Sequence, residues 1–86
     1  MSIKIEIPFY MRKVTNGREI IELNGNTVGE CIADFIRQFP DARDWFNPQN
    51  PIVWIVLNQT IVNFDQMDKK LKEGDDLSLI MVIGAG

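Results

Sequence analysis

One amphipathic segment between residues 27 and 40 limits what this chain can fold into. Thr27 and Glu30 form a capping-box pattern, in which the Thr27 side chain accepts from the Glu30 amide and the Glu30 side chain reaches back. Pro40 ends the helix that this pattern begins. The apolar residues in between recur at spacings of three and four, and so form one stripe: Val28, Cys31, Ile32, Phe35, Ile36 and Phe39. A helix with a single apolar stripe needs one surface to cover.

Segments on both sides of this helix have strand patterns. Residues 2–7 alternate strictly between polar residues and isoleucine, which indicates a half-buried strand. After the turn dipeptide Asn16-Gly17, residues 18–23 predict a second strand, and the two form a hairpin with a long loop. Residues 41–51 read as a connector with one short helical turn at 42–46, whose Trp45 and Phe46 cover the end of the core. Three further strands are predicted at 52–57, 60–62 and 77–83.

The order of these elements predicts an α+β roll, because a helix between a hairpin and later strands must lie across a sheet. The crossover through the helix favours a last strand that lies parallel to the first, in the middle of the sheet. This arrangement is a β-grasp, with a mixed sheet of four to five strands and the main helix across one face. The 86 residues are expected to form a single domain, 1–86.

Composition excludes several kinds of site. The net charge of −3 does not fit a nucleic-acid-binding surface. The absence of histidine excludes a His-based catalytic triad and a His-ligated metal. The only cysteine, Cys31, forms no internal disulfide and no thiolate metal site, and its place on the helix stripe predicts a buried, inert thiol. No apolar run reaches the roughly 18–20 residues needed to cross a membrane. The first residues do not resemble a signal peptide, so we expect a cytoplasmic protein.

The last three residues, Gly84, Ala85 and Gly86, lose bulky side chains where the backbone leaves the final strand. Local composition fits an ordinary frayed terminus. It fits equally a thin, flexible tail that threads a narrow channel and presents its carboxylate. Composition alone leaves these alternatives open.

The chain resembles the MoaD/ThiS family of ubiquitin-like sulfur carriers over essentially its whole length. Residues 27–30, Thr-Val-Gly-Glu, are similar to the T-V-x-E/D-L of that family. Residues 56–59, Val-Leu-Asn-Gln, resemble its V-x-V-N-G/x turn, and residues 71–77, Leu-Lys-Glu-Gly-Asp-Asp-Leu, resemble its L-x-x-G-D-x-V/L. The last two motifs together, ahead of a terminal strand and a glycine tail, are fairly specific.

The resemblance implies a carrier and not an enzyme, with no catalytic residue and no bound cofactor. An adenylating enzyme would use ATP to activate the Gly86 carboxylate, and sulfur would then replace the adenylate to give a thiocarboxylate. A sulfur-accepting synthase subunit would receive the sulfur for molybdopterin, thiamin or another cofactor. Two alternatives remain, a β-grasp interaction module and a ubiquitin-like protein modifier that shares the activated Gly86.

One residue departs from the family pattern. The family ends in Gly-Gly, whereas this chain has Ala85 at the penultimate position. The methyl group removes backbone conformations with positive φ, which only glycine adopts cheaply. Either Ala85 is tolerated by the activating enzyme, which we favour, or the chain has become a binding protein.

Strand alternation also predicts a partner-binding surface. If Val53, Ile55 and Leu57 point inward, neighbouring side chains project from the opposite face of two central strands. An apolar patch on an open sheet face usually marks a partner site. We therefore expect docking through the following residues, with Phe9 extending the patch: Trp54, Val56, Ile80 and Val82.

Overall fold

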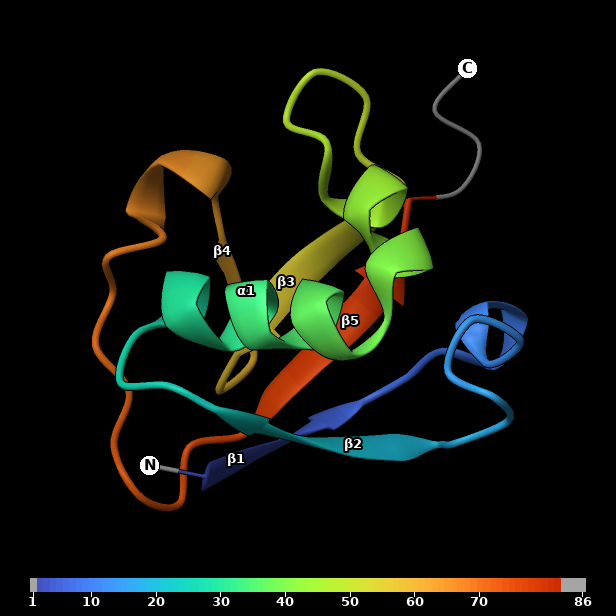
Figure 1. Cartoon of the computed structure of the whole chain (residues 1–86). Coiled ribbons are helices and arrows are strands. Elements are labelled where there is room, and N and C mark those ends of the chain that lie inside the picture. The colour runs from blue at the N-terminus through green and yellow to red at the C-terminus, as the bar shows by residue number, and fades with distance from the viewer. Residues whose placement is uncertain (1, 83–86) are drawn as a thin grey trace.

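The computed structural model describes residues 2–82 and has the β-grasp arrangement predicted from the element order (Figure 1). The tail predicted at residues 84–86 lies outside these residues. The strands are β1 (Ser2–Glu6), β2 (Ile20–Asn24), β3 (Val53–Leu57), β4 (Thr60–Val62) and β5 (Leu77–Met81), and the main helix is α1 (Val28–Gln38). Short 3₁₀ helices form η1 (Phe9–Met11), η2 (Pro40–Phe46) and η3 (Phe64–Gln66).

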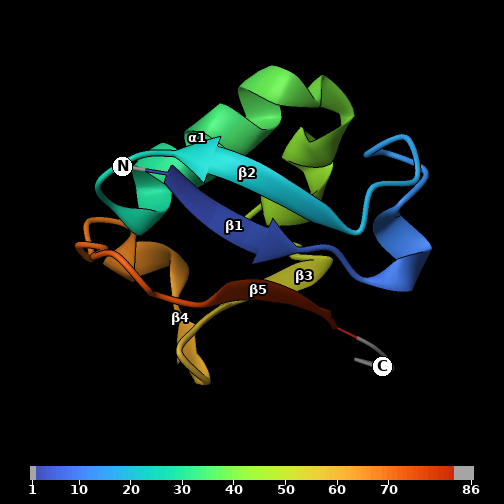
Figure 2. The same ribbon diagram turned by 90° about the horizontal axis from the view of Figure 1, so that it is seen from below.

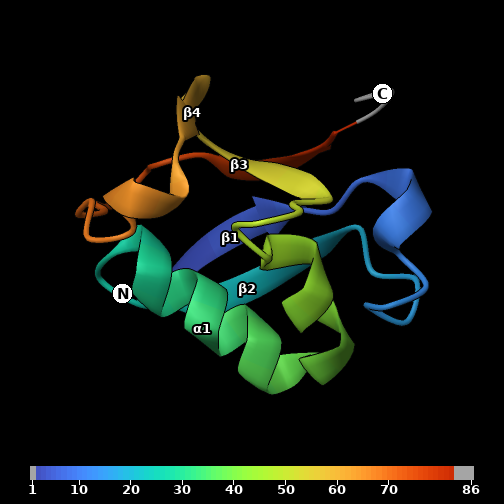
Figure 3. The ribbon, with the colours of Figure 1, turned by 90° about the horizontal axis from the view of Figure 1, so that it is seen from above.

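The five strands form one mixed sheet in the order β2-β1-β5-β3-β4. The predicted central pairing of the first and last strands is confirmed, since β1 and β5 are parallel with Ile5 opposite Leu77. The other pairs are antiparallel. Helix α1 crosses one face of this sheet (Figure 3). Because β1 and β5 run the same way, both end on the side of the molecule where η1 lies (Figure 2).

The core fills the space between α1 and the sheet. Four residues of the predicted stripe are buried, and the other two, Ile36 and Phe39, are partly buried against them. The connector forms a longer 3₁₀ helix than the single turn predicted. Its Trp45 and Phe46 are buried, and their rings lie 6.1 and 5.8 Å from that of Phe35, in edge-on contacts that close the end of the core.

The N-terminus of α1 is capped in two ways. Thr27 Oγ1 accepts from the Glu30 amide at 3.1 Å, as the capping-box pattern predicts. The Glu30 carboxylate reaches back one residue further, to the Asn26 amide at 2.6 Å. The amide of Gly29, in the first turn of α1, has no acceptor within the helix and donates instead to the Met67 carbonyl at 2.8 Å. A Cβ at residue 29 would lie 3.0 Å from that oxygen, so a side chain there would push the backbone at Met67 away from the helix.

Asp34 is a buried residue that the helix pattern did not predict as part of the interior. Its carboxylate accepts from the Asn24 amide at 3.0 Å and from Gln38 Nε2 at 2.9 Å, and forms an ion pair with Arg37. Gln38 also donates to the Glu22 carbonyl at 3.2 Å, so two α1 side chains cover the free edge of β2. The Asn24 amide, with help from Arg37 and Gln38, holds the pKa of Asp34 below its ordinary value.

Replacing Asp34 by alanine should lower the free energy of unfolding at neutral pH by about 2–3 kcal/mol, because the Asn24 amide and Gln38 lose a charged acceptor. The pKa of Asp34 is lower in the folded chain than its ordinary 3.8. Its contribution is therefore complete above about that pH and is lost as the pH falls through the folded pKa. Urea unfolding at several pH values should show the difference between wild type and Asp34→Ala shrinking in acid.

The matched control for this variant is Arg37→Ala. The Arg37 side chain is 72% exposed, so losing its ion pair should cost less than about 1 kcal/mol. An Asp34→Ala variant as stable as Arg37→Ala at neutral pH would show that the Asn24 contact contributes little.

Candidate functional site

The end of β5 leads to the C-terminal residues that the sequence predicts to be functional. The amide of Val82, the last residue described, donates to the Ile52 carbonyl at 2.8 Å and continues the β3–β5 pairing past Met81. The chain goes on from this point to Gly84, Ala85 and Gly86, which lie outside the described residues. The side of the sheet where β5 ends is therefore the side from which these residues follow.

Beside this end lies an apolar surface on the sheet face opposite α1. Val53, Ile55 and Leu57 are buried, as predicted, and the alternating residues point the other way. Trp54 of β3 lies directly opposite Ile80 of β5, and the two are 42% and 44% exposed. We call this surface the outer apolar face. It consists of Trp54, Val56, Ile61 and Ile80, and continued alternation past the end of β5 would add Val82.

Ile61 also belongs to this face, although it is not among the residues predicted from strand alternation. It lies opposite Val56 on β4 and is 42% exposed. The signal was present, because a two-residue turn at Asn58 and Gln59 fixes the register of the hairpin and places residue 61 opposite residue 56. A cavity of about 230 Å³ adjoins the face and is lined by these residues: Pro51, Trp54, Ile61, Val62, Asn63 and Phe64.

Phe9, also predicted to contact a partner, lies on η1 in the connection between β1 and β2 and is 66% exposed. Its ring contacts Tyr10 edge-on, with the centroids 5.7 Å apart. The structure thus places Phe9 in the part of this connection formed by residues 9–18, which we call the η1 loop. Its role in binding, like that of the outer apolar face, stays a prediction.

The two motifs that carried the family resemblance at residues 56–59 and 71–77 lie against each other. Asn58 and Gln59 both have positive φ, 58 at 50° and 59 at 72°, in the tight turn predicted there. Asn58 Nδ2 donates to Asp75 at 3.0 Å, and the Asp76 amide donates to Asn58 Oδ1 at 2.9 Å. The hydrogen bond from Asn58, with that from the Lys72 amide, lowers the pKa of the Asp75 carboxyl. The two motifs therefore form one structural unit that positions the start of β5.

The described residues offer little for covalent chemistry. Cys31 is fully buried, as predicted, and burial, with the nearby Asp34 charge, raises the pKa of its thiol. A buried thiol with a raised pKa is a poor nucleophile. Within residues 2–82, no three of the acidic and cysteine side chains are grouped in a way that could hold a metal ion. No helix in the same part of the chain has the length and apolar character to span a membrane.

Comparison with known proteins gives a family and a set of similar folds. The model of the ThiS family matches residues 5–86. A comparison with curated proteins finds no match. Among solved structures, the chain is similar to one in the BexX/CysO complex of Amycolatopsis orientalis, with a TM-score of 0.82, 23% identity, and coverage of 98% of this chain and 99% of that one.

Two further structures have the same fold at lower identity. SAMP1 from Haloferax volcanii gives a TM-score of 0.77 at 15% identity, with both chains fully covered. The complex of subunits 1 and 2 of molybdopterin-converting factor from Helicobacter pylori 26695 gives 0.69 at 19% identity, again with full coverage of both chains. These likenesses establish the β-grasp fold.

The family match extends over nearly the whole chain, including the two motifs, the outer apolar face and the C-terminal residues. Proteins of this family do not catalyse reactions, and serve as small subunits or substrates of partner enzymes. The chain belongs to the ThiS family of β-grasp sulfur carriers.

Proposed function

We propose that this chain carries sulfur on its C-terminal Gly86 and donates it in the biosynthesis of molybdopterin, thiamin or another cofactor. The observation that carries the proposal is that the ThiS family match runs through residue 86 and so covers Gly84, Ala85 and Gly86. The alternatives, a protein modifier and a binding module, share the fold and differ in what happens at Gly86.

The proposed cycle assigns the catalysis to partners. In an adenylating enzyme, a Gly86 carboxylate oxygen attacks the α-phosphate of ATP, and pyrophosphate leaves. Hydrosulfide or its equivalent attacks the carbonyl carbon of the acyl adenylate, and AMP leaves with the bonding electron pair. The product is a thiocarboxylate. The part of this chain is to present an acyl group without a side chain, which a closed active site can admit.

Docking is assigned to the outer apolar face. Its support is the exposure of Trp54 and Ile80 on adjacent strands, next to the end of β5. A protein that receives the tail would cover this face at the same time. The proposed partners are the adenylating enzyme and the sulfur-accepting synthase subunit. Two of the similar structures, the BexX/CysO complex and the complex of subunits 1 and 2 of molybdopterin-converting factor, are protein–protein complexes.

The test is mass spectrometry of the chain after incubation with the adenylating enzyme of its own organism, ATP, magnesium and hydrosulfide. A carrier should gain the mass expected when one terminal oxygen becomes sulfur. Conjugates on lysines of other proteins, in material purified from the native host, would indicate a modifier. Absence of both, in a chain whose cellular role survives removal of Gly86, would leave the binding module.

Replacing Ala85 by glycine should accelerate adenylation by about fivefold. A backbone conformation that costs alanine about 1 kcal/mol more than glycine slows a step by about that factor. The measurement is ATP–pyrophosphate exchange at saturating carrier. Ala85→Val, with a larger side chain, should be slower than wild type. Equal rates for all three chains would show that the channel of the enzyme does not restrict residue 85.

A further inference from the structure

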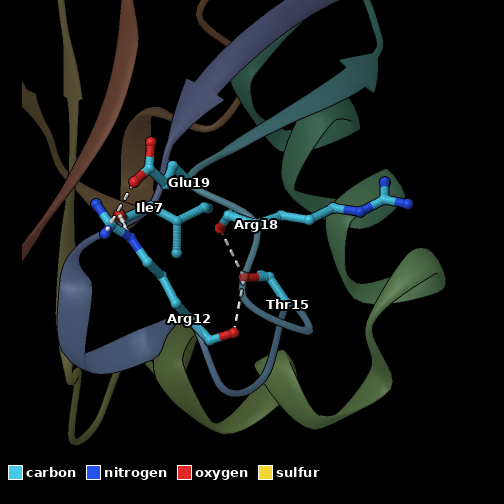
Figure 4. Close-up of polar contacts among 5 residues, drawn as sticks. All are labelled: Ile7, Arg12, Thr15, Arg18 and Glu19. Atoms are coloured by element: carbon cyan, nitrogen blue, oxygen red, sulfur yellow. Dashed lines mark hydrogen bonds and ion pairs between the residues drawn. The ribbon is translucent and has the colours of Figure 1, made fainter.

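The connection between β1 and β2 is a hydrogen-bonded loop of fixed shape. The Thr15 hydroxyl is fully buried between the carbonyls of Arg12 and Arg18, at 3.1 and 2.9 Å (Figure 4). The Gly17 amide donates to the Arg12 carbonyl at 2.6 Å, and Arg12 Nε donates to the Ile7 carbonyl at 3.2 Å. Few rotatable bonds remain to be ordered when such a loop meets a partner.

This loop exposes two aromatic rings. Tyr10 and Phe9 are 77% and 66% exposed, more than any other large hydrophobic side chain in residues 2–82. The neighbouring Met11 is buried and anchors η1 to the core. The Arg12 guanidinium lies 5.6 Å from the centre of the Phe9 ring, which fixes the ring in a cation–π contact. Exposed rings on a fixed backbone contribute nothing to the core and are typical of binding loops.

The loop is also one of two basic segments in an acidic chain; the other, residues 69–72, is flanked directly by Asp68 and Glu73. Residues 7–18 contain Arg12, Lys13 and Arg18 and no carboxylate, whereas the other six basic residues are outnumbered by twelve acidic ones. A shallow hollow of about 530 Å³ is lined by Phe9, Tyr10, Arg12, Lys13 and Gly17. Lys13 and Arg18 are both exposed. The nearest carboxylate along the chain, Glu19, pairs with Arg12 at 3.4 Å, and neither Lys13 nor Arg18 forms an ion pair within residues 2–82.

The loop lies on the side of the molecule where β5 ends. The segment before β5, residues 65–76, carries five carboxylates and three lysines and lies on the other side (Figures 1 and 2). We propose that this loop, residues 9–18, docks an acidic surface of the protein that receives the C-terminal tail. The inference rests on the proposed function. Charge complementarity carries it: an acidic surface would repel the rest of this chain, so local attraction at the loop orients the tail end toward it.

The test compares two double charge reversals with the same change in net charge. Lys13→Glu/Arg18→Glu alters the loop, and Lys69→Glu/Lys72→Glu, also at exposed positions, alters the far end. ATP–pyrophosphate exchange with the adenylating enzyme should show KM raised about tenfold for the loop variant at low salt, with kcat nearly unchanged. The difference should shrink in about 0.5 M salt. The far-end variant should stay within about twofold of wild type.

Tyr10→Ala tests the aromatic part, and should raise KM severalfold while leaving the melting temperature unchanged. Equal effects of the two charge reversals, or no effect of the loop variant, would overturn the inference. If wild type is not adenylated at all, the proposed function fails instead. In that case, calorimetric titration without ATP measures how tightly wild type and the loop variant bind the same enzyme. Loop-dependent binding would support it, and binding that is independent of the loop, or no binding, would overturn it.

Discussion

A chain that ends at Ala85 should not be adenylated at a detectable rate. Removing Gly86 moves the terminal carboxylate back by one residue, about 3.3–3.6 Å along an extended chain. A displacement of only about 1 Å at a reacting centre can cost about a hundredfold, so we expect a loss of at least about a thousandfold. ATP–pyrophosphate exchange and mass spectrometry both measure it: neither exchange nor thiocarboxylate should be found.

Two controls separate chemistry from folding in this experiment. The buried hydrophobic core extends from Ile3 to Leu79, so the shortened chain should melt at the wild-type temperature. Gly86→Ala keeps the length and adds a methyl group beside the reacting carbonyl, and should retain part of the activity, about one tenth or less. A shortened chain that is still converted to a thiocarboxylate would contradict the assignment of Gly86 as the sulfur-bearing residue.

The fold could be predicted from the sequence because the pattern that identifies each helix or strand lies within that element. Alternation in residues 2–7 and the spacing of the 28–39 stripe each depend on the period of one element, and the element order then leaves few topologies. Asp34 was missed for the opposite reason. A carboxylate on a helix is normally solvated, and only tertiary contact brings the Asn24 amide of β2 to it.

The candidate site likewise contains residues that local patterns predict and residues that only tertiary contacts place. The outward positions of Trp54 and Ile80 follow from two-residue alternation along β3 and β5, so they were predictable. For the η1 loop, the sequence pattern predicts only a long connection between two strands, with Phe9 as a partner contact. The shape of this loop depends on hydrogen bonds of the buried Thr15 hydroxyl and on the bond from Arg12 to the Ile7 carbonyl. The periodicity of the sequence does not predict such contacts.

The two tryptophans provide the sharpest test of the outer apolar face, because they differ in burial and not in chemistry. Trp54→Ala should raise the dissociation constant for the adenylating enzyme by about thirtyfold or more. This is the loss of about 2 kcal/mol that a central aromatic contact typically contributes. Because Trp54 is 42% exposed in the free chain, the substitution should change the melting temperature by less than about 4 °C.

Trp45→Ala is the matched control. Trp45 is 8% exposed and packs edge-on against Phe35, so removing it should cost about 3–5 kcal/mol of folding free energy. Thermal melting and calorimetric titration of both variants distinguish the two roles. If Trp54→Ala destabilised the chain as much as Trp45→Ala, Trp54 would be a packing residue. If it left both stability and affinity unchanged, docking would have to occur elsewhere than on the outer apolar face.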